Sequence, residues 1–378
     1  MDKPNNNGHL QLTGLPVEIL RIILSHSVDI ISLDSTVHSC GTLFHAFYAF
    51  PAPIITAVIH REIGKDLLFE AVRFARALDF SRSRHRATVV ANAAFAEFLR
   101  RDQESPHQLR WTLPGACFVT HLDRIVKSSS LRIESEILAR IQSIHPHMEM
   151  RPASSTELPR IQRALYRFET YRFLFPARRD YDFDYSDDDS DNINVLDDEM
   201  KAQMLFLAAS PPWENEQLGC IHESLWRLVA PAYNDLALHS IEWEGRRRPA
   251  RDYGDACIEY LLSGGLKEIH EISLCNTWAK RYDLLGYDQP HRPVRDFRGF
   301  LRKTFDYYEG YCLIKYPPTT GAHKDTHYPV GQDTTEQGSQ RTWDWLIERW
   351  PEQPNFEARK RVAVVIETTR LRACGYVF

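Results

Sequence analysis

The chain has 378 residues, which at about 150 residues per domain suggests two or three compact units, or one small module on a larger irregular body. Hydrophobic residues make up 43% and charged residues 26%, close to what an ordinary soluble protein shows. The formal net charge is −5, but residues 180–199 alone contribute −10, so the rest of the chain carries +5. This mild excess of positive charge does not predict a nucleic-acid partner.

Seven cysteines occur without any Cys-x-x-Cys pair, which predicts reduced thiols and an intracellular protein. The first residues lack the apolar run of a secretory signal. No stretch approaches the roughly 18 apolar residues that a membrane span needs. We therefore expect a cytoplasmic or nuclear location and no membrane partner.

Residues 1–11 are polar and predict a flexible tail, after which the first helix is expected to begin at Pro16. Glu18 lies in its first turn, where a negative charge favours the helix dipole. One apolar face recurs at helical spacing and consists of Ile19, Leu20, Ile23 and Leu24.

A second helix is expected after Asp29 and Ser32, whose side chains can cap it. Its apolar face is formed by Leu33, Val37, Cys40, Phe44 and Phe47. A module of about 40 residues buries too little surface to be stable alone. Much of this apolar surface must therefore meet another surface, either the rest of the chain or a separate protein.

The same stretch reads Leu15-Pro16-x-Glu18-Ile19-Leu20-x-x-Ile23-Leu24, then Ser32-Leu33 and an apolar stripe that ends near Phe44. This pattern resembles the F-box of fungal F-box proteins. Weaker similarity to that group continues at residues 52–68, 163–169 and 372–378. Many F-boxes carry a basic residue and a Trp in the third helix, and residues 37–44 lack both.

The resemblance implies a small three-helix module at residues 12–50 that docks onto a Skp-type adaptor. Through that adaptor the chain would join an SCF-type cullin-RING ubiquitin ligase, and the remaining chain would bind a protein substrate that the sequence does not identify. The adaptor-binding residues implied by the resemblance are Leu12, Leu15, Pro16, Ile19, Leu20, Ile23, Leu24, Leu33 and Val37. The alternative is that Leu-Pro-x-Glu-Ile-Leu merely starts a core helix and that the chain is a non-catalytic helical scaffold.

An irregular all-helical body is expected to follow, interrupted by an acidic, disordered insertion. We place the first part of the body at residues 51–179, the insertion at 180–198 and the second part at 199–378. Two early helices carry apolar faces formed by Ile54, Ile55, Val58, Ile59 and Ile63, and by Leu67, Leu68, Ala71, Val72, Ala75 and Leu78.

Later helices are expected throughout the body. Pro231 is expected to break or kink the chain between two of them, and Gly264-Gly265 to stop another. The predicted ranges are 87–99, 117–127, 131–144, 157–175, 199–209, 213–228, 233–241, 255–262, 294–308, 343–350 and 356–371. No repeat of fixed period is present.

The sequence contains only weak matches to motifs for catalysis, metal binding or modification. His323-Lys-Asp325 has the spacing of an iron site but no histidine follows His327, and Asp187-x-Asp189-x-Asp191 lacks the glycine of a calcium loop. Ser186 precedes three aspartates and is a candidate phosphorylation site. We predict no catalytic set, metal or cofactor, so ubiquitin transfer would be carried out by partners.

Overall fold

A computed structural model describes residues 12–84, 95, 98–99, 109–144, 146, 152–176, 200–239, 251–285, 300–301 and 304–305. This part of the chain is built from helices and their connections and contains no strand, which confirms the predicted mainly α fold class. The predicted tail at 1–11 and the predicted acidic insertion at 180–198 lie outside the described residues.

The chain divides into two compact units, which we describe separately. Unit 1 comprises Met1–Ala75 and Glu104–Arg124, and unit 2 comprises Arg76–Gln103 and Ile125–Phe378. Residues 12–50 thus lie inside a larger compact unit that also contains later segments.

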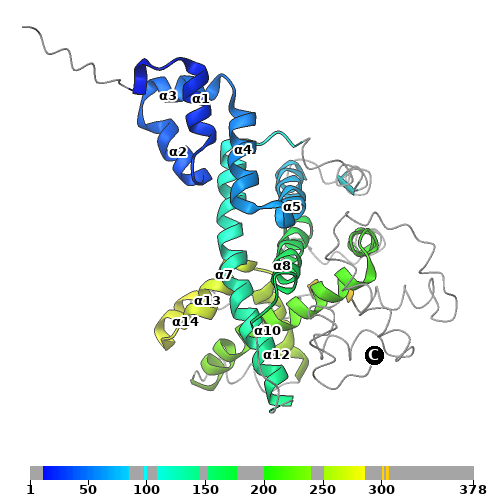
Figure 1. Cartoon of the computed structure of the whole chain (residues 1–378). Helices are drawn as coiled ribbons and strands as arrows, with labels where there is room; N and C mark the ends of the chain where they lie inside the picture. Colours follow the sequence, from blue (N-terminus) through cyan, green and yellow to red (C-terminus); the bar gives the residue numbers. More distant parts are fainter. Residues whose placement is uncertain are drawn as a thin grey trace, which may run out of the picture. The chain divides into compact units, whose positions relative to one another are not determined.

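Unit 1 begins with a short 3₁₀ turn, η1 (Leu12–Gly14), followed by α1 (Val17–Ser25), α2 (Ile30–Ser39), α3 (Gly41–Tyr48) and α4 (Pro51–Ile63). Helices α1, α2 and α3 pack against one another and against α4 (Figure 1). Helix α1 begins at Val17, one residue later than predicted, and the carbonyl of the preceding Pro16 accepts the Leu20 N–H at 3.1 Å. The structure therefore contains three short helices in residues 12–50.

The predicted second helix is interrupted, which corrects the sequence-based assignment. Cys40 adopts an extended conformation (φ −156°, ψ 154°), so α2 ends at Ser39 and α3 begins at Gly41. The break rotates the later residues, and Phe47 is buried whereas Phe44 is exposed. A continuous periodicity in the sequence is thus divided between two helices.

The faces predicted for the next two helices are confirmed. All five apolar residues predicted for α4 are buried, and so are the six predicted for α5 (Lys65–Arg84). Gly64 separates these helices with φ +85°, a conformation that favours glycine. Within unit 1, Phe74 of α5 stacks on Phe118 of α7 (Leu113–Ile144) with ring centroids 5.9 Å apart.

Helix α7 is a second correction, because the sequence predicts two helices where one is found. The three consecutive serines at 128–130 do not end it. Ser129 and Ser130 are buried, and the Ser130 hydroxyl donates to the Lys127 carbonyl at 2.8 Å. A serine side chain that bonds to the backbone of its own helix in this way does not interrupt the helix.

Unit 2 is built around α8 (Glu157–Leu174), which matches the predicted helix and packs against α10 (Pro212–His239). Most of α8 is buried, including Arg167, whose side chain is 2% exposed. Arg167 contacts Glu214 at 3.1 Å and donates to the Asn215 amide oxygen at 3.1 Å. Tyr171 shares a hydrogen bond of 2.6 Å with Thr304.

Pro231 lies inside α10 and does not end it, so the predicted break does not occur, and the alternative of a kink stays a prediction. Proline removes one backbone hydrogen bond and costs about 3 kcal/mol in a helix interior. Pro231 itself is exposed, whereas Ala230, Ala232 and Tyr233 around it are buried. Burial on the inner face thus holds the two halves of the helix together.

Three further helices of unit 2 are α12 (Arg251–Leu262), α13 (Leu266–Leu274) and α14 (Trp278–Leu285). Helix α12 begins four residues before the predicted start, and α13 and α14 were not predicted. The predicted stop at Gly264-Gly265 is confirmed, since Gly265 has φ +95° and precedes α13. Glu169 accepts the Leu266 N–H at 2.9 Å, so a side chain from α8 caps α13.

Candidate functional site

Exposed apolar side chains are concentrated in residues 12–50. This stretch contains ten of the sixteen large hydrophobic residues that are exposed in the described part of the chain. The ten are Leu12, Val17, Ile19, Ile22, Ile23, Val28, Ile31, Phe44, Tyr48 and Phe50. Single exposed apolar residues are ordinary, but a concentration of them marks an interaction site.

Helix α1 has two apolar faces. Leu20 and Leu24 point into unit 1 and are 2% and 0% exposed. Ile19, Ile22 and Ile23 are 42%, 54% and 38% exposed, and their i, i+3, i+4 spacing places them in a second stripe beside the buried leucines. Exposed apolar residues that form a stripe on one helix are suited to burial against a second protein surface.

Helix α3 presents an aromatic pair to solvent. The Phe44 and Tyr48 rings lie 4.3 Å apart, one helical turn from each other. His38 of α2 approaches the Phe44 ring edge-on, with centroids 6.2 Å apart. Aromatic residues are enriched in protein interfaces because each buries a large area with few rotatable bonds.

Arg21 joins α1 to the end of α3. Its Nε donates to the Ala46 carbonyl at 3.3 Å, and its guanidinium lies 5.4 Å from the centroid of the Phe50 ring. Because this side chain is engaged inside the module, it adds little free charge to the apolar surface.

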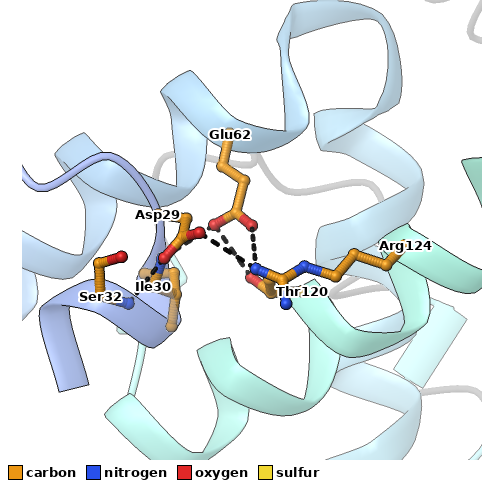
Figure 2. A network of polar contacts seen from close by, with 6 residues as sticks. All are labelled: Asp29, Ile30, Ser32, Glu62, Thr120 and Arg124. Atoms are coloured by element: carbon orange, nitrogen blue, oxygen red, sulfur yellow. Dashed lines mark hydrogen bonds and ion pairs between the residues drawn. The ribbon is translucent and has the colours of Figure 1, made fainter. Parts of the chain in front are cut away.

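The amino end of α2 is held by a polar network that also involves α4 and α7 (Figure 2). The Asp29 carboxylate caps α2 by accepting the Ser32 N–H at 2.6 Å. Glu62 accepts the Ile30 N–H at 3.0 Å, and Arg124 lies 3.1 Å from Asp29. The hydrogen bond from Ser32, reinforced by Arg124, lowers the pKa of Asp29 below its ordinary value.

The nine residues predicted for adaptor binding fall into an exposed or half-buried group and a buried group. Leu12, Pro16, Ile19 and Ile23 are exposed, and Leu15 is half-buried. Buried inside unit 1 are Leu20, Leu24, Leu33 and Val37. In this conformation a partner can touch the first group only, and the second group forms the core beneath it.

Several exposed residues were not predicted, chiefly Ile22, Ile31, Phe44 and Tyr48. Ile22 is detectable in the sequence, because Ile19, Ile22 and Ile23 form a second stripe beside Leu20 and Leu24. Phe44 is predicted to share one apolar face with Leu33 and Val37, but the extended Cys40 places it on a separate helix. Local periodicity does not reveal where one helix gives way to the next.

Other candidate sites from the sequence fall outside the described residues, namely Ser186, the Asp187–Asp191 motif and the His323-Lys-Asp325 motif. Within the described ranges, no group of three or more His, Cys, Asp or Glu side chains is placed to hold a metal ion. No single described helix is long and apolar enough to cross a membrane, and α3 and α4, bent by 93°, have the required length and composition only as a pair.

Comparison with known proteins does not assign the chain to a family. No protein-family model matches it, and neither a curated protein nor a solved structure is significantly similar to it. The candidate site therefore rests on the distribution of exposed and buried side chains in residues 12–50.

Proposed function

We propose that residues 12–50 dock onto a Skp-type adaptor and that the chain is a substrate receptor of an SCF-type cullin-RING ubiquitin ligase. The observation that carries this proposal is the exposed isoleucine face of α1, formed by Ile19, Ile22 and Ile23. It accompanies the Leu-Pro-x-Glu-Ile-Leu resemblance, which also directs an exposed face of this helix to the adaptor.

The surrounding charges support docking by apolar contact. Residues 12–50 contain only four charged side chains, Glu18, Arg21, Asp29 and Asp34. Arg21 and Asp29 are engaged within unit 1, and Asp34 lies 3.4 Å from His38. The cores of protein interfaces are depleted in charged residues in this way.

In this proposal the chain performs no bond chemistry. The helical body would hold a substrate protein while the adaptor connects it to the transferase, so that a substrate lysine is kept at high local concentration near the transfer machinery. The five described cysteines are all free thiols, which agrees with a reducing compartment such as the cytoplasm or nucleus.

Co-expression of the full chain with a Skp-type adaptor and a cullin tests this assignment. We expect the wild-type chain to recover both partners and Ile19→Ser/Ile23→Ser to recover neither, with both chains equally helical by circular dichroism. Leu205→Ser is the matched control, because Leu205 is a comparably exposed apolar residue of unit 2. Recovery of both partners by the double variant would contradict the proposed site; recovery of neither by the wild type would favour the non-catalytic scaffold.

A further inference from the structure

Glu62 connects three segments of unit 1 through one carboxylate (Figure 2). It lies at the end of α4, and its side chain is 12% exposed. Its Oε2 accepts the Ile30 N–H at 3.0 Å and the Thr120 hydroxyl at 3.3 Å. Its Oε1 lies 3.9 Å from Nη2 of Arg124. A residue outside 12–50 is thus anchored to α7 on one side and to α2 on the other.

The contact with Ile30 satisfies one of the first backbone N–H groups of α2. These groups have no partner within the helix and need an acceptor from elsewhere. Asp29 supplies the acceptor for Ser32, and Glu62 supplies the acceptor for Ile30. Both acceptors are carboxylates, which are favoured at the positive end of the helix dipole.

Arg124 allows the two carboxylates to share this helix end. Its Nη2 lies 3.1 Å from Oδ2 of Asp29 and 3.9 Å from Oε1 of Glu62. A guanidinium between two carboxylates offsets their mutual repulsion. The position of the α2 amino end therefore depends on α4 and α7 as well as on its own cap.

We infer that Glu62, held by Thr120 and Arg124, is a positioning residue for the adaptor-docking surface. This inference rests on the proposed function. Helix α2 carries the exposed Ile31, and its His38 contacts Phe44 of α3. Loosening the start of α2 lowers the fraction of molecules with a docking-competent surface, and apparent affinity falls by that fraction.

Calorimetric titration of the full chain with the adaptor tests the inference. Glu62→Ala removes the acceptor for Ile30, and we expect about tenfold weaker binding, the size of a lost helix cap. Glu62→Gln keeps an acceptor oxygen and should restore most of the affinity. Thr120→Val keeps the shape of a fully buried side chain but loses the hydroxyl, and should weaken binding about threefold.

Glu223→Gln is the matched control, since Glu223 pairs with Arg227 at 2.8 Å in unit 2 and should leave binding unchanged. Hydrogen exchange gives a second readout: the amides of residues 30–33 should exchange faster in Glu62→Ala, whereas those of residues 54–59 should not. Wild-type affinity in both Glu62→Ala and Thr120→Val would overturn the inference while the proposed function stands. Absence of binding by the wild-type chain would instead refute the proposed function itself.

Discussion

The Asp29 side chain shows how one residue stabilises the candidate docking module. It caps α2 through the Ser32 N–H and pairs with Arg124. We expect Asp29→Ala to reduce the free energy of unfolding by about 1 kcal/mol, because the cap is lost. Asp29→Asn should cost less, since its side-chain oxygen still accepts the Ser32 N–H. Urea unfolding of the full chain at pH 7 measures both, and equal losses would show that the charge outweighs the cap.

The lowered pKa of Asp29 also predicts a pH dependence. A carboxyl whose pKa is lower in the folded state stabilises the protein above its ordinary pKa of 3.8, and this contribution disappears as the pH falls through the folded value. Unfolding free energies measured from pH 6 to pH 3 should therefore fall more steeply for the wild type than for Asp29→Asn. If the unfolding free energies of the two proteins fell in parallel with pH, the lowered pKa of Asp29 would be contradicted.

Neighbouring residues of α1 should respond differently to truncation. Leu20 is buried, so Leu20→Ala should cost about 2–5 kcal/mol of unfolding free energy. Ile22 is exposed, so Ile22→Ala should change it by less than about 0.5 kcal/mol. Chemical denaturation of the two variants checks this contrast, and a large loss in Ile22→Ala would place that side chain in the core.

At the scale of helices, the sequence predicts apolar faces better than helix ends. The faces of α4 and α5 follow directly from their periodicity, because one stripe meets the core. The break at Cys40 is marked only by the adjacent Gly41, whereas the serines of α7 and Pro231 of α10 look like interruptions but lie inside helices. Tertiary burial decides these cases, and local propensity does not encode it.

The same limit applies to the candidate site. The Leu-Pro-x-Glu-Ile-Leu pattern locates the module but does not tell which of Ile19, Leu20 and Ile23 faces inward. That choice depends on α3 and α4, which pack against α1. Glu62, Thr120 and Arg124 could not be assigned to the module from sequence, since they lie far along the chain from α2 and follow no motif.

Gly265 offers a test of the junction between α12 and α13. Its φ of +95° is strained for any residue with a side chain, and an added Cβ would clash with the Arg172 side chain. We expect Gly265→Ala to cost about 1–2 kcal/mol of unfolding free energy. Gly41→Ala is the control, because nothing lies within 4 Å of its added Cβ and φ is not positive there. Thermal unfolding of both variants measures this difference, and equal midpoints would contradict the strain expected at Gly265.

At the scale of the whole molecule, the most strongly charged segment and the candidate docking module lie in different parts of the chain. Residues 180–199 hold ten acidic side chains, whereas the candidate docking module holds four charged residues in all. Adaptor binding driven by apolar burial should therefore change less than about threefold in Kd between 0.05 M and 0.5 M salt. Fluorescence anisotropy at both concentrations measures this, and a strong loss of affinity at high salt would point to a charged interface.

The most direct test of the central claim is a calorimetric titration of the purified full chain with a purified Skp-type adaptor. We predict saturable 1:1 binding with a negative heat-capacity change, because apolar surface is buried. Ile19→Ser/Ile23→Ser should abolish this binding while the circular dichroism spectrum is retained. A wild-type chain that is folded and gives no binding heat at any temperature would contradict the account.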